Sequence, residues 1–367
     1  MDDAANRRDF LRRSGALGIA GAGVLGYPLL ETRVAGAAPL LPPRDTIAAG
    51  GGATVKIGHI DGFSGVYAAA SASQQLGMEV AVEAAMKKTS RIKYVILKGD
   101  DASAPATGGT EARRLISQEK VDVLTGCLSS GVGLAVSNIA EQLGTFFLAV
   151  GTHDTNITGQ GAHHVTFRQT CSNAMLANAV GPAMLKWGKK WYFITADYAF
   201  GNDVAVGLPV DDIVGSTWGY VWGPEAGGTR TAAIYKALKA KSKNVDWRQY
   251  LGMMAAENII NRLNAIGTTD TTKLIASFEE FTYDAGKKAP GHFRKCDHQA
   301  VQQTYAGTIV PKAKRRSDGE YFVISSTVGG EFAAESCGEP DSAAATKVFT
   351  TETPIPAREG YSVLSLK

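Results

Sequence analysis

The stretch VDVLTGCLSSGVGLAVSNIAEQLGTFFLAVG, residues 121–151, decides the fold. It contains an apolar strand over 121–126, a helix over 132–144 and a second apolar strand over 145–151. Strands that are apolar along most of their length are typical of a parallel sheet that is covered on both faces. The segment therefore predicts a βαβ unit, in which a helix joins two parallel strands.

The same alternation of strands and helices extends to both sides of this unit. Further strands are predicted at 54–60, 92–101, 189–201, 213–225 and 319–328. Further helices are predicted at 75–88, 107–120 with Thr110 as its N-cap, 172–188, 229–241, 247–267 and 268–281 with Asp270 or Thr271 as its cap. The pattern predicts an α/β fold with parallel sheets flanked by helices.

Length and charge narrow the class of protein. The chain has 367 residues, of which 44% are hydrophobic and 20% charged, so one large or two ordinary globular domains can form. A net charge of +3 without a long basic run argues against a nucleic-acid partner. The densest basic patch, PKAKRRSDGE (311–320), is interpreted as a solvated turn before a strand rather than as a phosphate site.

The N-terminus resembles a twin-arginine export signal. Paired Arg7 and Arg8 precede Phe10 and Leu11, and a Gly/Ala-rich apolar stretch follows that is too short to span a membrane stably. Ala35 and Ala37 give a small-x-small cleavage pattern. We expect residues 1–37 to be the signal and 38–53 a disordered linker, which places the mature protein in the periplasm. The alternative interpretation is a mobile basic N-terminus.

The chain has four cysteines, Cys127, Cys171, Cys296 and Cys337, and no C-x-x-C spacing. Zinc binding and redox chemistry are therefore disfavoured. An even number of cysteines in an exported protein suggests disulfides. A bridge between Cys296 and Cys337 would clip the C-terminal segment, and a bridge between Cys127 and Cys171 is the weaker alternative. Sequence alone does not choose among the possible pairings.

Small polar loops follow several of the predicted strands. They are DGFSGVYAAAS (61–71), GCLSSG (126–131), GTHDTNITG (151–159) and ADYAFG (196–201). In open α/β sheets, ligands bind beyond the carboxyl ends of the strands, where such loops lie. No loop contains G-x-G-x-x-G, a P-loop or a G-x-S-x-G elbow, which disfavours nucleotide binding and serine hydrolysis. The histidines form no ligand pattern, so we expect no metal.

The order and content of these segments resemble a known family, the solute-binding proteins of ABC importers with the type I periplasmic fold, in the branched-chain amino acid and amide group. The resemblance rests on residues 55–68, 100–142, 157–159, 191–201 and 251–284. It implies a two-lobe protein without enzymatic activity or cofactor. Such a protein closes around a small polar solute and delivers it to an ABC permease in the inner membrane.

The first lobe offers donors for a negatively polarised oxygen. A helix N-terminus has N–H groups without intrahelical acceptors and a partial positive charge, so it stabilises a carboxylate or amide oxygen. Ser129 and Ser130 would add hydroxyl donors at the start of the helix, and Gly126 and Gly131 would let the backbone approach the ligand. The alternative role for the two serines is simple N-capping.

The resemblance implies further ligand contacts. In the first lobe it extends to Gly151, Thr152 and His153, and it implies that Tyr67 flanks the ligand. For the ammonium of an amino acid, Asp197 is the first candidate acceptor. Asp154 is the second, with holding a turn as its alternative role. Tyr198, with Phe200, would close over the ligand from the second lobe.

The resemblance also predicts that the second lobe is incomplete. In the family, further strand–helix units follow the DYAFG loop, whereas here ten residues, 202–211, lead to the aromatic strand. We expect lobe I at 54–172 and 225–290, and a truncated lobe II at 173–224 and 291–367. The alternatives to solute transport are an exported Rossmann-type cofactor enzyme, and a ligand sensor or a remnant that binds nothing.

Overall fold

The computed structural model describes residues 53–88, 92–159, 161–184, 214–279, 281–317 and 319–335. By its internal contacts the chain divides into two units, Met1–Pro39 and Leu40–Lys367, and all described residues belong to the second. The predicted export signal lies outside the described residues, as do the loop with Asp197, Tyr198 and Phe200, the segment 202–211 and Cys337. The predictions that concern them stay predictions.

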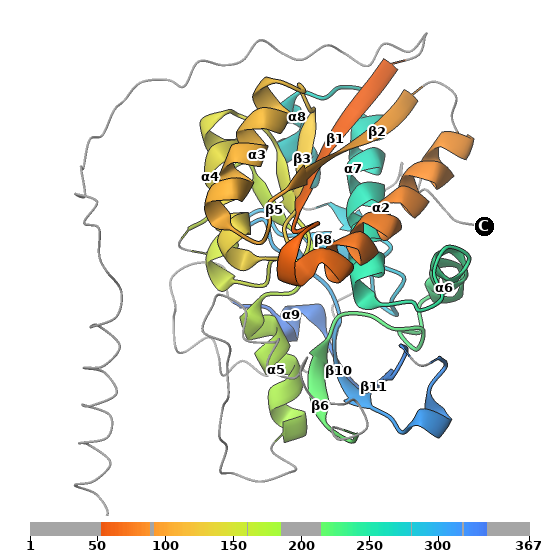
Figure 1. The fold of residues 1–367 in the computed structure, drawn as a ribbon. Coiled ribbons are helices and arrows are strands. Elements are labelled where there is room, and N and C mark those ends of the chain that lie inside the picture. The colour runs from red at the N-terminus through yellow and green to blue at the C-terminus, as the bar shows by residue number, and fades with distance from the viewer. Residues whose placement is uncertain are drawn as a thin grey trace, which may run out of the picture. The chain divides into compact units, whose positions relative to one another are not determined.

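The first sheet has five parallel strands in the order β2-β1-β3-β4-β5 (Figure 1). The strands are β1 (Ala53–Asp61), β2 (Ile92–Asp100), β3 (Val123–Gly126), β4 (Phe147–Ala149) and β5 (Thr166–Arg168). Helices cover both faces, since α3 (Pro105–Ser117) and α4 (Ser130–Gln142) lie on one side and α2 (Ala68–Lys88) and α7 (Trp247–Ile266) on the other (Figure 1). The predicted parallel α/β sheet is confirmed.

Helix α3 begins earlier than predicted. Ala104 is its N-cap and Pro105 its first residue, a position that proline favours because the missing N–H would have no intrahelical acceptor there. Thr110 lies inside the helix and its hydroxyl donates to the carbonyl of Ala106 (3.1 Å). The prediction of Thr110 as N-cap is therefore wrong, because the preceding Pro-Ala-Thr segment is helical as well.

Helix α2 also begins earlier than predicted, at Ala68 instead of residue 75, whereas α7 begins at the predicted residue and α8 (Thr271–Phe278) at a predicted cap. In α7, the carboxylate of the N-cap Asp246 accepts from the N–H groups of Arg248 (2.8 Å) and Gln249 (3.0 Å), and Gly267 ends the helix with a φ of +66°. Asp270 caps α8 by accepting from the N–H of Lys273 (2.9 Å), as predicted. Helix α6 (Thr231–Lys239) packs against α2 and α7.

The second sheet differs from the expectation of parallel strands. Its described strands, β11 (Phe322–Val328), β10 (Thr304–Ile309) and β6 (Thr217–Tyr220), are antiparallel. The reason is the connection 310–321, which reverses the chain so that β11 returns beside β10. Helix α5 (Asn173–Met184) packs against this sheet, and α9 (Gly330–Ala333) packs against α5.

The strands of a third, small antiparallel sheet lie between β6 and β10 in the chain. It consists of β7 (Thr282–Tyr283), β8 (Gly291–Phe293) and β9 (Ala300–Val301). Phe293 joins the aromatic core at 5.8 Å from the ring of Phe167 and 5.2 Å from that of Phe278. The three rings are fully buried, so burial of apolar surface fixes the small sheet against the first one.

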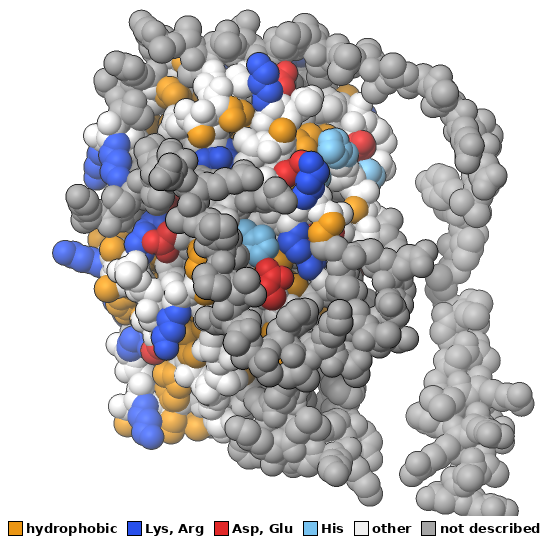
Figure 2. Space-filling view, turned by 180° about the vertical axis from the view of Figure 1, so that it is seen from behind, with side chains coloured by type: hydrophobic (Ala, Val, Ile, Leu, Met, Phe, Trp, Pro, Cys, Tyr) orange, Lys and Arg blue, Asp and Glu red, His pale blue; other side chains and the backbone are white. Residues whose placement is uncertain are grey.

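The surface of the described residues is mixed in charge. On the face drawn in Figure 2, Lys and Arg side chains are interspersed with Asp and Glu side chains and with white, uncharged ones. Among the described residues, no helix is long and apolar enough to cross a membrane.

Candidate functional site

Three loops meet at the carboxyl edge of the first sheet. They follow β1 at Asp61, β3 at Gly126 and β4 at Ala149, and parallel strands present their carboxyl ends at one edge. Six residues predicted for the site lie in these loops or at the helix start that follows: Tyr67, Ser129, Ser130, Gly151, Thr152 and His153. The topology thus brings the first-lobe candidates to a common edge.

The two serines at the start of α4 have different surroundings. Ser129 is the N-cap, its side chain makes no capping hydrogen bond and it is half-buried. Ser130 is the first helical residue, is 1% exposed, and its hydroxyl accepts from the N–H of Asp154 (3.3 Å). The hydroxyl of Ser129 is therefore not engaged in capping α4, whereas Ser130 ties α4 to the loop after β4.

The conformation of the turn between β3 and α4 requires a glycine at position 126. Gly126 has a φ of +121°, and a Cβ added there would lie 2.1 Å from the carbonyl oxygen of Ile60. The next residue, Cys127, has a left-handed φ of 65°, and its N–H donates to the same carbonyl (2.7 Å). Gly126 thus permits close approach to β1. A Cβ added at Gly131 would meet Pro105 of α3 at 3.3 Å.

Asp61, which the sequence analysis did not select, joins the loops to α2. Its side chain is fully buried, and one carboxylate oxygen accepts from the N–H groups of Gly62 (3.0 Å) and Leu128 (3.1 Å). The other oxygen accepts from the side-chain amide of Gln74 (2.8 Å). An aspartate at the end of a buried strand is the sequence signal that could have identified it.

Thr152 and Gly151 fasten the loop after β4 to the loop after β3. The hydroxyl of Thr152 donates to the carbonyl of Cys127 (2.7 Å) and the side chain is fully buried. A Cβ added at Gly151 would lie 2.5 Å from the side chain of Leu128. Both positions are therefore fixed by packing between the two loops.

His153 is buried and electrically neutral. It is 2% exposed, and its Nδ1 forms a hydrogen bond of 2.8 Å with the carbonyl of Cys171. Burial lowers the pKa of His153 to about 4, which outweighs the opposite effect of that bond. Since a carbonyl only accepts, Nδ1 carries the proton and Nε2 is the acceptor nitrogen. At this position the ring can thus accept a hydrogen bond from an N–H or O–H group.

An aromatic side chain that the sequence analysis missed lies beside His153. The ring of Trp247, at the start of α7, meets the imidazole edge-to-face at 5.8 Å, and the guanidinium of Arg248 lies 4.5 Å from the indole centroid. No sequence signal distinguished Trp247 from a core residue, because Trp247 lies 94 residues after His153 along the chain.

The side chain of Asp154 holds a turn, as its alternative interpretation predicts. Its carboxylate caps the short helix η2 (Thr155–Ile157) by accepting from the N–H of Asn156 (2.7 Å). Its carbonyl accepts from the guanidinium of Arg168, which is 1% exposed. The carboxylate of Asp154 is therefore engaged within its own loop.

Tyr67 and a second buried carboxyl lie next to Gly62. A Cβ added at Gly62 would be 3.2 Å from the Cβ of Tyr67 and 2.8 Å from the hydroxyl of Ser103. Asp101 is fully buried, and one of its oxygens accepts from the N–H of Ser103 (2.6 Å). Burial, assisted by the charge of Asp61, raises the pKa of Asp101 to about 7. Sequence analysis did not single out Asp101.

The structure decides against one of the two predicted disulfides. Cys127 and Cys171 are both free and buried, so the alternative bridge between them is excluded. Cys337 lies outside the described residues, and its pairing with Cys296 stays a prediction. Within the described part of the chain, no group of three or more His, Cys, Asp or Glu side chains is arranged to hold a metal ion.

The fold is that of the type I periplasmic binding proteins, with a parallel sheet flanked by helices. A family model described as periplasmic binding protein matches residues 54–210. A periplasmic binding protein from Burkholderia mallei superposes with a TM-score of 0.69 at 18% identity, covering 77% of this chain and 96% of that one. A branched-chain amino acid ABC transporter ligand-binding protein from Burkholderia xenovorans LB400 gives 0.66 at 17%, covering 76% and 96%.

Curated relatives match part of the chain. The Leu/Ile/Val-binding protein homolog 7 of Brucella suis is 32% identical over 170 residues, which is 43% of this chain and 42% of that protein. The homolog 7 of Brucella abortus is 35% identical over the same shares. The match thus spans about two fifths of the length of these relatives. The family whose model matches residues 54–210 is one of binding proteins.

Proposed function

We propose that the protein is an extracytoplasmic solute-binding protein of an ABC importer. The observation that carries the proposal is the start of α4, where Ser129 makes no side-chain cap bond and the first N–H groups have no acceptor within the helix. The loops after β1 and β4 are tied to this point through Asp61, Thr152 and Ser130. Such a preorganised donor set stabilises a negatively polarised oxygen.

The solute is a small polar molecule with a carboxylate or amide oxygen. A branched-chain amino acid, an amide or a urea-like compound meets this requirement, and the names of the Brucella relatives favour the first. A protein of the same fold from Rhodopseudomonas palustris BisB5, with a TM-score of 0.66 at 16% identity over 76% of this chain and 98% of that one, was solved with 3,4-dihydroxybenzoic acid. Aromatic acids share the carboxylate and belong in the same test.

The first-lobe residues divide between donors and acceptors. The N–H groups at the start of α4 and the hydroxyl of Ser129 face the solute's oxygen, and the Nε2 of His153 accepts from its ammonium or hydroxyl. Ser130, Gly151 and Thr152 fix the backbone of the loops after β3 and β4, and Tyr67 flanks the solute. Asp197 and Tyr198 contact it from the second lobe.

The partner is an ABC permease in the inner membrane. The protein is exported to the periplasm by its twin-arginine signal and closes its two lobes, the second of them incomplete, around the solute before delivery. The names of the similar binding proteins, several of them components of ABC transporters, support this assignment.

A thermal-shift screen of the full-length chain against amino acids, amides, urea and hydroxybenzoic acids tests the proposal. A solute that binds the folded state raises the melting temperature in proportion to the logarithm of its concentration above Kd. We expect such a rise for one class of carboxylate or amide. A chain that no compound stabilises would be the non-binding remnant, and a cofactor absorbance spectrum would favour an exported enzyme.

A further inference from the structure

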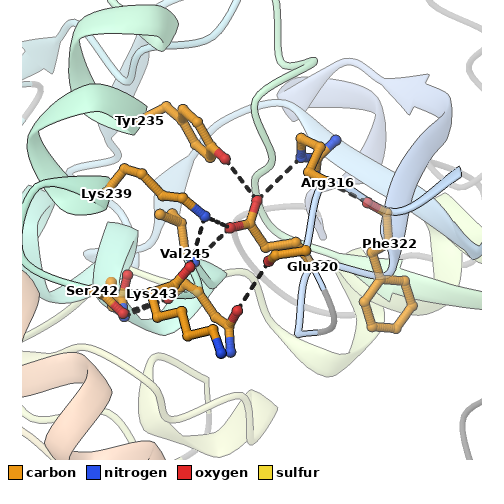
Figure 3. A network of polar contacts seen from close by, with 11 residues as sticks. Tyr235, Lys239, Ser242, Lys243, Val245, Arg316, Glu320 and Phe322 are labelled. Carbon is orange, nitrogen blue, oxygen red and sulfur yellow. Dashed lines mark hydrogen bonds and ion pairs between the residues drawn. The ribbon is translucent and has the colours of Figure 1, made fainter. Parts of the chain in front are cut away.

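The connection between β10 and β11 folds back onto the helices of the first sheet. Glu320, near its end, has a side chain that is 1% exposed (Figure 3). Four donors reach its carboxylate: the ammonium of Lys239 (2.5 Å), the hydroxyl of Tyr235 (2.8 Å), the N–H of Val245 (3.2 Å) and the guanidinium of Arg316 (3.3 Å). A buried carboxylate with a full set of donors is a specific contact between two segments.

Three of the four donors belong to the side of the first sheet, whereas Arg316 lies in the same connection as Glu320. Tyr235 and Lys239 are on α6, whose Ile234 and Leu238 are fully buried in the main core. The segment 240–246 is held on α7, because the side-chain amide of Gln249 donates to the hydroxyl of Ser242 (3.1 Å) and the carbonyl of Asn244 (3.1 Å).

Glu320 itself belongs to the side of the second sheet. It lies two residues before β11 in the connection that starts after β10, and both strands lie in that sheet. A second contact lies beside it, where the hydroxyl of Ser317 donates to the side chain of Asn244 (2.9 Å). A Cβ added at Gly319 would be 2.4 Å from the same asparagine, so the two segments fit closely.

The chemistry of this contact suits a reversible closure. All the groups that form this contact are polar, and Lys239 is already 35% exposed. When the segments separate, water can therefore replace the hydrogen-bond partners that each group loses. An apolar contact of the same extent would lose its burial energy on separation. The main apolar core also includes Tyr220 of β6 and Tyr305 of β10, so the Glu320 contact is a polar part of the boundary between the two sheets.

We propose that Glu320 and its donors form a latch between the two lobes, which holds them in the present arrangement and opens when they separate. The inference rests on the proposed function, because a protein that closes around a solute needs a contact that resolves on opening. The latch stabilises the closed arrangement and thereby sets the fraction of chains that are closed without solute.

The test is a distance measurement in the full-length chain without solute. Spin labels are placed at Thr110→Cys on α3 and Ser326→Cys on β11, both exposed positions on opposite sheets. Cys127 and Cys171 are buried, and the chain without the two added cysteines gives the labelling background. In Glu320→Gln, we expect at least a doubling of the population at longer distances, and Tyr235→Phe should shift it in the same direction.

The matched control is Glu83→Gln. This change also removes a carboxylate that pairs with a lysine, Lys241 (2.9 Å), but Glu83 lies on α2 and Lys241 just after α6, so both are on the side of the first sheet. We expect the distances of this variant to equal those of the unchanged chain. If Glu320→Gln is folded by circular dichroism and its distances do not change, the contact is static and the latch is wrong.

Two further outcomes separate this inference from the proposed function. If Glu320→Gln cannot be folded, Tyr235→Phe decides alone, since it removes one donor and leaves the carboxylate with three. If the distances shift but no solute stabilises the chain, the latch holds and the proposed function fails. Where a solute is found, Glu320→Gln should weaken its affinity about threefold to tenfold, because fewer chains are closed beforehand.

Discussion

Ser129 and Ser130 are adjacent in the chain, but their hydroxyl groups have different tasks. Ser130 is buried and accepts from the N–H of Asp154, so removing its oxygen leaves a donor without an acceptor. Ser129 makes no cap bond, so removing its oxygen leaves the fold as it is. The two substitutions therefore separate binding from stability.

We expect Ser129→Ala to weaken solute binding by about 1.5–3 kcal/mol, which is the range for hydrogen bonds to charged groups. Its free energy of unfolding should stay within about 0.5 kcal/mol of the unchanged chain, whereas Ser130→Ala should lose about 1–3 kcal/mol. Calorimetric titration and urea unfolding measure the two quantities. Asn138→Ala, on the exposed face of α4, is the control and should change neither. Unchanged affinity in Ser129→Ala would remove this hydroxyl from the site.

His153 predicts how stability depends on pH. Its pKa in the folded chain is about 4 against an ordinary 6.5, so the unfolded chain binds a proton at a higher pH than the folded one. The stabilisation is complete above about pH 6.5 and is lost as the pH falls towards 4, by up to about 3 kcal/mol at about 1.4 kcal/mol for each pH unit. Urea unfolding at pH 7.5, 6 and 5 measures it. In His153→Gln this part of the pH dependence should disappear, and an unchanged slope would contradict the assignment.

At the scale of single residues, the sequence predicted which loops form the carboxyl edge of the sheet but not which contacts their side chains make. The loops follow from strand ends, which are visible as apolar runs that stop at Asp61, Gly126 and Val150. The direction of each hydroxyl depends on partners that are distant along the chain, such as Cys127 for Thr152. The same holds for Trp247, which meets His153 only after α7 has returned to the first sheet.

The helices α2 and α7 cross through a pair of glycines. A Cβ added at Gly77 of α2 would lie 1.8 Å from the carbonyl oxygen of Gln249, and one added at Gly252 of α7 would lie 2.0 Å from that of Gln74. Both atoms that an added Cβ would meet belong to the backbone, so they cannot move away by a change of rotamer as a side chain can. The two backbones can approach this closely only because neither position has a side chain.

We expect Gly77→Ala and Gly252→Ala each to lower the free energy of unfolding by about 1–3 kcal/mol, because the helices must move apart. The control is Gly109→Ala on α3, where the nearest atom to an added Cβ is 3.8 Å away. This change should raise stability by about 0.5–1 kcal/mol, since alanine favours a helix over glycine. Urea unfolding compares the three. Equal effects at all three positions would mean that the crossing is not close-packed.

Element prediction identified the cap of α8, but it misplaced the start of α3 and the strand direction of the second sheet. For α8 the sequence offered Asp270 or Thr271 as the cap, and Asp270 is the residue that caps it. The start of α3 was placed too late because Thr110 is a good cap residue in isolation, whereas Pro105 already suits the first turn. The antiparallel pairing of β10 with β11 depends on the reversing connection 310–321, whose direction no local pattern indicates.

At the scale of the whole molecule, two sheets with different strand directions share one chain. Apart from Ala53, the strands of the parallel sheet lie within the matched segment 54–210. The candidate donors lie at the carboxyl edge of this sheet. The second sheet is joined to the helices of the first through Glu320. Burial acts to raise the pKa of Glu320, but the hydrogen bonds from Lys239 and Tyr235 outweigh it and lower the pKa to about 2. The stabilisation from this carboxylate is therefore complete above about its ordinary 4.5 and is lost as the pH falls towards 2.

The central claim is that a solute oxygen binds at the amide groups that start α4. A crystal structure of the full-length chain with the compound that stabilises it most in the thermal-shift screen tests this directly. We predict a carboxylate or amide oxygen of the solute within about 3.2 Å of an N–H group of the first turn of α4 or of the Ser129 hydroxyl. A solute bound elsewhere, with this helix start filled by the protein's own side chains, would contradict the account.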